Sequence, residues 1–217
     1  AKLQESRMKK GWPLSMTVAT SKINKAQVEE SISSLSDSIH FHVSMQSFND
    51  STLTEIKRVN ISLIDYLEII KNLRKKDVPS TCELILGLPE ETKESHLAGI
   101  KTAIDADIDD ISLYTCMLLR NTTLSESLYF NRFGIVEKFR VVPRACGKYM
   151  GVKIIEREKV GVSTTKLSIE EYVSLRGFHF IISSFYNLRA LNEIVLYLRS
   201  INISIFDWLM KVYEYIQ

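Results

Sequence analysis

In the first half of the chain, segments with the hydrophobic pattern of strands alternate with segments that have the pattern of helices. Four segments have the alternation or the β-branched composition of strands: residues 15–20, 40–46, 81–86 and 109–117. Helical spacing or capping residues predict helices before and between them: residues 1–10, 25–35, 51–57, 63–75 and 92–106. Strands that alternate with helices form a parallel sheet through right-handed crossovers. The pattern predicts an α/β fold, as a doubly wound sheet or a (β/α) barrel, with ligands at the carboxyl ends of the strands.

Two of these elements show which side they bury. In the helix expected over 63–75, the apolar side consists of Leu63, Leu67, Ile70 and Leu73. In the strand expected over 40–46, one face carries Phe41, Val43 and Met45, and the other carries His40, His42, Ser44 and Gln46. A parallel strand that is buried on both faces is apolar throughout. A polar face therefore indicates either a cavity that holds a polar ligand or the wet face of an edge strand.

After residue 121 the pattern changes. Basic residues and turn formers mix with apolar residues over 139–151, and 152–164 has the composition of a strand. Ser168 and Glu171 form a capping box that begins a helical region. We expect this region to break at three residues: Gly177, Asn187 and Asn202. We therefore divide the chain into an α/β part and an α+β, mainly helical part: residues 1–125 and 126–217.

Composition narrows the function classes. Hydrophobic residues make up 45% and charged residues 25% of the 217 positions, which is typical of an ordinary globular protein. A net charge of +2 gives no electrostatic argument for nucleic acid or an anionic membrane as a partner. Cys82, Cys116 and Cys146 have no metal-ligand spacing, and reduced thiols fit a cytoplasmic protein. The chain has no apolar run of about eighteen residues, so we expect no membrane span.

Three polar side chains stand near predicted strand ends. Gln46 ends one strand, Arg58 follows the short helix after it, and Glu83 lies in the next strand. An amide, a guanidinium and a carboxylate can together hold an amino-acid-like ligand that carries a sugar, because Arg pairs bidentately with a carboxylate. The alternative is an internal ion pair between Arg58 and Glu83. Gly87 permits close backbone approach, either to a ligand or in a tight strand-to-helix turn.

Two weaker signals lie elsewhere. His40 and His42 share a strand face and could bind a metal, but no third ligand is evident, so a solvent-facing role is the alternative. A basic set in the second half could meet an anion or form a solvated loop: Arg140, Arg144 and Lys148.

Two segments resemble the radical S-adenosylmethionine enzymes. Residues 43–50 (VSMQSFND), with Arg58 and Asn60, are similar to a later strand of that barrel and the step after it. Residues 83–92 (ELILGLPEET) are similar to its strand-five signature. The first segment looks like the subgroup that carries a cobalamin-binding domain. The resemblance implies a partial (β/α) TIM-type barrel over 1–125, followed by a smaller, mainly helical region.

The resemblance also implies a cofactor-binding set for S-adenosylmethionine: Gln46, Arg58, Glu83, Ser44, Ser47 and Gly87. Many relatives carry Asp where Glu83 stands. The Cys-x3-Cys-x2-Cys loop that ligates the family's [4Fe–4S] cluster is absent, and the three cysteines of this chain do not replace it. We therefore expect a C-terminal fragment whose cluster ligands lie upstream of residue 1, and we expect the isolated chain to be inactive.

By this resemblance the function is radical-based modification of an unidentified substrate, with cobalamin-dependent methylation as the first option. A cobalamin-free radical dehydrogenase, mutase or methylthiotransferase shares the same strands. A barrel-derived binding module without redox chemistry is the alternative from another class. The expected partners are the small-molecule cofactor, the substrate and the upstream segment of the same polypeptide. A barrel that lacks its first strands exposes an edge at residues 16–20, so we expect association in solution.

Overall fold

The structure is a computed structural model that describes residues 2–12, 14–19 and 39–217. The helix predicted over 25–35 lies outside these residues. The first half contains, in order, α1 (Lys2–Lys10), β1 (Met16–Ala19), β2 (Ile39–Gln46), α3 (Asp50–Glu55), α4 (Leu63–Arg74), β3 (Ser80–Leu86), α5 (Lys93–Asp105) and β4 (Asp110–Thr115). These bounds confirm the predicted strands and the described helices of this half to within a few residues.

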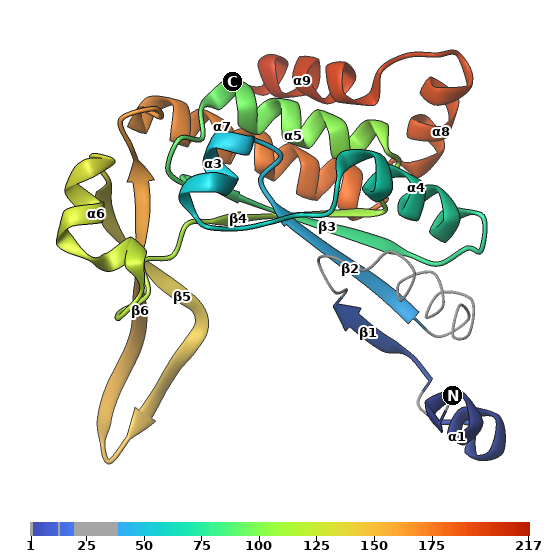
Figure 1. Cartoon of the computed structure of the whole chain (residues 1–217), viewed down its shortest axis with the longest axis horizontal. Helices are drawn as coiled ribbons and strands as arrows, with labels where there is room; N and C mark the ends of the chain where they lie inside the picture. The colour runs from blue at the N-terminus through green and yellow to red at the C-terminus, as the bar shows by residue number, and fades with distance from the viewer. Residues whose placement is uncertain (1, 13, 20–38) are drawn as a thin grey trace.

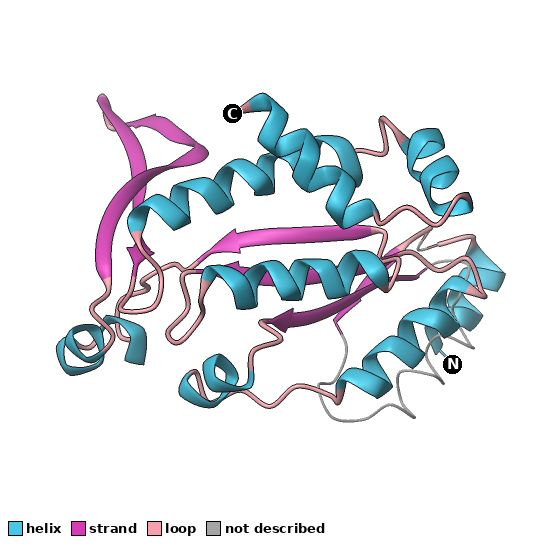
Figure 2. Cartoon of the chain, turned by 90° about the horizontal axis from the view of Figure 1, so that it is seen from above, coloured by secondary structure: helices cyan, strands magenta, loops and turns pink. Residues whose placement is uncertain are grey.

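The four strands form one parallel sheet in the order β1-β2-β3-β4. An order that follows the sequence without reversal is that of a barrel wall, because a doubly wound sheet reverses its strand order at a switch point. Helices α3, α4 and α5 lie over one face of the sheet (Figures 1 and 2). The fold is therefore α/β, with a partial TIM-type barrel wall.

The second half adds a hairpin and a helical layer. Its elements are the 3-10 turn Thr123–Ser125, α6 (Ser127–Arg132), β5 (Val136–Tyr149), β6 (Val152–Ser163), α7 (Ile169–Ile181), the π-helical turn Ile182–Asn187, α8 (Asn192–Ser200) and α9 (Ile205–Ile216). The predicted capping box between Ser168 and Glu171 begins α7. None of the described helices is long and apolar enough to cross a membrane.

The helices of the second half complete the hydrophobic core of the sheet. Leu84 of β3 and Ile100 of α5 belong to the same buried cluster as Phe178 of α7 and Leu209 of α9. Helix α7 packs beside α5 over the sheet, and α9 covers both (Figure 1). The division into 1–125 and 126–217 stays a prediction, and the two parts share this core.

The buried side of α4 agrees with the prediction at Ile70 and Leu73 and differs from it nearer the start of the helix. Leu63 and Leu67 are exposed, whereas Tyr66 and Ile69 are almost fully buried. Tyr66 meets the ring of Phe48 edge-on, with centroids 5.7 Å apart. The helix is therefore rotated so that its aromatic residue fills the space beside β2, a contact that spacing alone does not indicate.

The hairpin runs through residues that were predicted to form turns. Pro143 and Gly147 lie inside β5, and the pairing with β6 is irregular between Val141 and Cys146. The chain reverses after Tyr149 instead. A proline is tolerated in a strand where the ladder is interrupted, which explains its place here. The base of the hairpin joins the main sheet, since the Gly161 amide donates to the Cys116 carbonyl at 2.9 Å.

Of the three predicted helix breaks, Asn187 and Asn202 are confirmed and Gly177 is wrong. Gly177 lies within α7, and a Cβ at this position would meet the Tyr213 ring at 2.8 Å. The glycine permits close packing of α7 against α9 rather than ending the helix.

Candidate functional site

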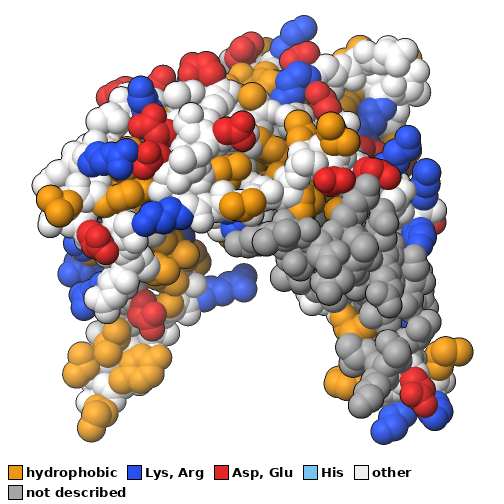
Figure 3. All heavy atoms as spheres, viewed as in Figure 1, with side chains coloured by type: hydrophobic (Ala, Val, Ile, Leu, Met, Phe, Trp, Pro, Cys, Tyr) orange, Lys and Arg blue, Asp and Glu red, His pale blue; other side chains and the backbone are white. Residues whose placement is uncertain are grey.

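The face of the sheet opposite the helices carries polar side chains. Alternation along the strands places these half-buried residues on it: His42, Ser44, Thr81, Glu83, Asp110 and Ser112. Ser44, Glu83 and Ser112 are register partners, so they form one row across three strands. The space-filling view shows open space below the sheet, on the side where the hairpin projects (Figure 3). This polar face is the first candidate for a ligand site.

Glu83 is the carboxylate at the centre of this row. Its Oε1 lies 3.9 Å from Nδ1 of His42, and both side chains are about one-third exposed. Arg58 and Glu83 form no ion pair, although Glu83 is near enough that its charge raises the pKa of Arg58. Burial has the larger effect and lowers that pKa. The alternative of a direct Arg58–Glu83 ion pair is therefore not what this structure contains.

Gln46 occupies an unusual turn at the carboxyl end of β2. The pairing of β2 with β3 shifts between Ser44 and Gln46, which leaves Met45 as an extra residue. Gln46 has a φ of 61°, and the Ser47 amide donates to the Met45 carbonyl at 2.8 Å. This is a γ-turn with a positive central φ, a rare and strained form. Such residues cost about 1–3 kcal/mol and occur most often at functional sites.

Arg58 and Asn60 hold the backbone of this turn. The Asn60 amide group donates to the carbonyls of Met45 at 2.7 Å and of Ser47 at 3.2 Å. Arg58 donates through Nη2 to the Ser44 carbonyl and through Nε to Asn60 Oδ1, the latter at 2.7 Å. The predicted Arg58 therefore lies at the site, and two of its N–H groups donate to groups of the protein.

Ser47 joins the turn to a carboxylate that the sequence did not single out. Its hydroxyl donates to Glu91, which is almost fully buried, and the Ser95 hydroxyl donates to the other oxygen of Glu91 at 2.8 Å. Burial raises the pKa of Glu91, and these hydrogen bonds oppose that rise. Glu91 lies in the segment 83–92 on which the resemblance rests, but only the fold brings it to Ser47.

A side chain at position 87 would crowd the neighbouring hairpin, which explains why this residue is glycine. Its φ is 88°, and a Cβ there would lie 3.1 Å from the Gly161 carbonyl oxygen of β6. The close approach that the sequence predicts is thus made to the hairpin. A cofactor contact at Gly87 stays a prediction.

No metal centre is formed by the described residues, which contain no group of three or more His, Cys, Asp or Glu side chains with suitable placement. Cys82 and Cys116 are buried, and burial raises the pKa of each thiol to about 12. Cys146 is exposed on the hairpin. A thiolate is the form that binds iron, so these residues do not fit the ligand set of a [4Fe–4S] cluster.

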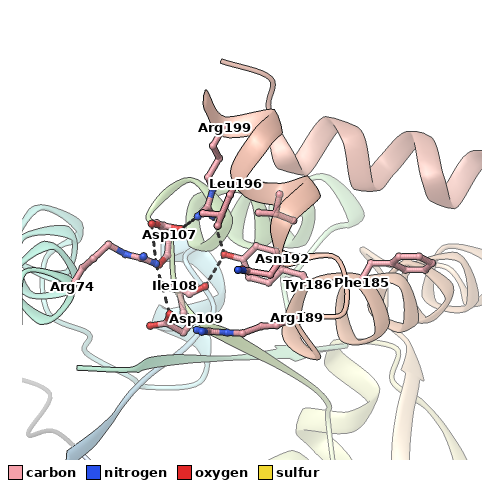
Figure 4. Close-up of a pocket in the computed structure, with 11 residues that line it drawn as sticks. Arg74, Asp107, Ile108, Asp109, Phe185, Tyr186, Arg189, Asn192, Leu196 and Arg199 are labelled. Carbon is pink, nitrogen blue, oxygen red and sulfur yellow. Dashed lines mark hydrogen bonds and ion pairs between the residues drawn. The ribbon is translucent and has the colours of Figure 1, made fainter. Parts of the chain in front are cut away.

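A second concave region lies at the amino ends of the strands (Figure 4). Asp107 and Asp109 precede β4 there, and Arg74, Arg189 and Arg199 converge on them. Arg74 Nη2 lies 2.8 Å from an oxygen of Asp107, while Arg189 pairs with Asp109 and Arg199 with Asp107. These ion pairs tie α4 and α8 to the sheet. Residues at this end of a barrel serve stability.

Comparisons with known proteins point to one enzyme family. No protein-family model matches the chain. The cobalamin-dependent radical SAM methyltransferase TokK of Streptomyces tokunonensis is 32% identical over 103 residues, which cover 47% of this chain and 14% of TokK. The 2-(S-pantetheinyl)-carbapenam-3-carboxylate methyltransferase of Streptantibioticus cattleyicolor is 31% identical over 140 residues, which cover 63% of this chain and 20% of that enzyme. The chain thus spans at most a fifth of either relative.

Solved structures overlap with this chain only in part. Coproporphyrinogen III oxidase (HemN) from Escherichia coli, a radical SAM enzyme, has a TM-score of 0.39 and 19% identity, covering 46% of this chain and 23% of HemN. The radical S-adenosylmethionine methyltransferase TsrM from Kitasatospora setae has a TM-score of 0.42 and 13% identity, covering 52% of this chain and 23% of TsrM. The assignment therefore rests on sequence similarity. That similarity is to radical S-adenosylmethionine enzymes, in the group that includes cobalamin-dependent methyltransferases.

Proposed function

We propose that this chain supplies part of the S-adenosylmethionine site of a radical methyltransferase that uses cobalamin. The observation that carries the proposal is the polar row of Ser44, Glu83 and Ser112 on the uncovered face of the sheet, next to the strained turn at Gln46. In parallel α/β folds, ligands bind at the carboxyl ends of the strands. The turn lies at that end of β2.

Each proposed contact has a chemical reason. Glu83 is half-buried and carries an acceptor carboxylate, which suits the ammonium group or the ribose hydroxyls of S-adenosylmethionine. Arg58 has five N–H donors, and Nη1 makes no hydrogen bond to the described residues, so that group suits the cofactor's carboxylate. Gln46 supplies an amide at the strand end, and Ser44 supplies a hydroxyl in the same row as Glu83.

The residues of this chain do not fit the [4Fe–4S] cluster, as the buried thiols show. In the family, that cluster supplies the electron that cleaves S-adenosylmethionine. The share that we propose for this chain is to bind and orient the cofactor against the polar face. Use of cobalamin follows the TokK similarity and, like the substrate, stays part of the proposal.

Cofactor binding can be tested on the chain as it stands. Saturation-transfer NMR with S-adenosylmethionine should detect binding, and Glu83→Gln should weaken it about 10-fold, because a charge-assisted hydrogen bond contributes about 1.5–3 kcal/mol. The matched control is Glu94→Gln, an exposed carboxylate in the first turn of α5. Equal affinities for both variants, or no binding by the wild-type chain, would contradict the proposal.

A further inference from the structure

The strained turn at Gln46 needs support from outside β2. A non-glycine residue with a φ of 61° in a γ-turn persists only where its surroundings over-determine the conformation. No regular strand pairing provides that support, because the register with β3 is interrupted between Ser44 and Gln46. Side chains from other elements must therefore keep the turn in place.

One set of hydrogen bonds to the turn comes from side chains in the loop after α3. The single amide group of Asn60 binds the carbonyls on both sides of Gln46, those of Met45 and Ser47. Arg58 orients Asn60 through its Nε and binds the carbonyl one residue earlier, that of Ser44. A conformation in which the carbonyls of Ser44, Met45 and Ser47 are bound in this way cannot relax to an ordinary strand without losing several hydrogen bonds.

A second set of contacts fixes the turn from the start of α5. Glu91 accepts from Ser47 on one oxygen and from Ser95 on the other. Ser95 is itself held, because it forms the capping box of α5 with Thr92, at 2.9 and 3.1 Å. Asn49 extends this link, since its Nδ2 donates to the Glu90 carbonyl at 3.1 Å. The turn is thereby attached to a helix N-terminus that packs in the core.

Glu91 cannot be a direct ligand of a molecule on the open face. It is only 1% exposed, and protein hydroxyls occupy both of its oxygens. A buried carboxylate without partners is costly, so its position is tightly determined by these serines. Its effect on any ligand must pass through Ser47 and the turn.

We infer that Glu91 and Asn60 are positioning residues that hold Gln46 in its strained turn and so set the affinity for S-adenosylmethionine. The affinity half of this inference rests on the proposed function. The clamp, by which we mean the hydrogen bonds through which Glu91 and Asn60 hold the turn, does not rest on it, because these bonds concern the protein alone.

Amide hydrogen exchange by NMR tests the clamp without any ligand. Glu91→Leu removes the acceptor, and the Ser47 amide should then exchange at least about 10-fold faster, whereas the Leu84 amide in the core of β3 should not change. Glu91→Gln keeps an acceptor oxygen and should restore slow exchange at Ser47. An unchanged rate at Ser47 in Glu91→Leu, or equal acceleration at Leu84, would overturn the clamp.

A double-mutant cycle covers the case in which Glu91→Leu does not fold. Without Asn60 the wild-type turn can relax and release its strain, which offsets part of the lost hydrogen bonding, whereas glycine adopts a positive φ without strain. Asn60→Ala should therefore lower the free energy of unfolding by more in a Gln46→Gly background than in the wild type. Additive effects would overturn the inference.

Affinity is measured on the same variants. S-adenosylmethionine should bind about 10-fold more weakly to Glu91→Leu and with near wild-type affinity to Glu91→Gln. Lack of binding by the wild-type chain overturns the proposed function and the affinity half of the inference, while the exchange rates still decide the clamp. Equal affinity in Glu91→Leu together with faster Ser47 exchange would overturn the affinity half alone.

Discussion

At the scale of single residues, Gly177 shows that a glycine within a helical pattern can mark a packing contact rather than a break. The Tyr213 ring lies over it, and the Tyr213 hydroxyl donates to the Ser174 carbonyl at 2.7 Å. The ring cannot move aside without losing that hydrogen bond. The close contact between α7 and α9 therefore depends on the absence of a side chain at Gly177.

Gly177→Ala should destabilise the protein by about 1–3 kcal/mol, the usual effect of overpacking, because the new Cβ would meet the ring at 2.8 Å. Helix propensity alone predicts the opposite sign, a gain of about 0.5–1 kcal/mol. Urea denaturation distinguishes the two. Val173→Ala, at an exposed position of the same helix, is the control and should change the free energy of unfolding by less than about 0.5 kcal/mol.

The site was predictable only where its residues obey a local rule. The two-residue alternation of β2 predicted that His42 and Ser44 share the polar face of that strand, because a strand's side chains alternate whatever lies around it. The positive φ of Gln46 and the roles of Asn60 and Glu91 have no such rule. They arise from contacts between segments more than ten residues apart, which no local pattern encodes.

At the scale of elements, α5 and α7 meet through two buried histidines. Nε2 of His96 lies 2.9 Å from Nε2 of His179, and Arg176 Nη1 lies 3.3 Å from Nδ1 of His179. Because Arg can only donate, Nδ1 of His179 accepts, its Nε2 carries the proton, and His96 Nε2 accepts that proton's hydrogen bond. Both rings are therefore neutral in the folded protein. Burial lowers the pKa of His96 to about 4 and that of His179 well below its usual value, with His96 and Arg176 adding to the latter.

This pair should make the protein sensitive to acid. Between pH 6.5 and about 4 the unfolded chain binds protons at these histidines and the folded chain does not, so stability falls as pH falls. Each histidine contributes up to about 1.4 kcal/mol per pH unit. Urea denaturation across this range measures the slope.

A double variant, His96→Leu with His179→Leu, removes both titrating groups and should flatten the pH profile. His40→Gln, an exposed histidine of β2, is the control and should leave the slope unchanged. A slope that survives in the double variant would show that other groups cause the acid sensitivity.

The elements themselves were predictable where pattern and packing agree. The strands of the sheet and α5 were found because apolar spacing and caps coincide with their ends. The prediction for the buried side of α4 is confirmed at Ile70 and Leu73 and wrong at Leu63 and Leu67, because Tyr66 fills the core beside Phe48. The course of β5 was missed because Pro143 usually ends a strand, and only the irregular pairing with β6 accommodates it here.

At the scale of the whole molecule, helices α3, α4, α5, α7 and α9 cover one side of the barrel wall, and the polar side faces away from them. Figure 1 shows the hairpin of β5 and β6 projecting on that polar side, and Figure 3 shows the open space next to it. The face thus has a cofactor-like set of polar groups, but none of the described residues offers a cluster of metal ligands. The proposed function therefore separates cofactor binding from the redox centre.

That separation leads to a prediction for the chain of 217 residues. After anaerobic reconstitution with iron and sulfide and reduction by dithionite, it should produce no 5′-deoxyadenosine from S-adenosylmethionine. The physical reason is that Cys82 and Cys116 are buried thiols with pKa values of about 12, which leaves Cys146 as the one exposed thiol of the chain. One thiolate cannot satisfy a cluster that cysteines normally hold at three or four irons.

Mass spectrometry of the nucleoside product and the iron content of the protein measure the outcome together. Cys146→Ser is the control, and it should match the wild type in product while losing any iron bound nonspecifically at the exposed thiol. Formation of 5′-deoxyadenosine by the wild-type chain would mean that the buried thiols become accessible, since Cys146 alone is insufficient. Binding of S-adenosylmethionine without cleavage is the combination that the proposed function predicts for this chain.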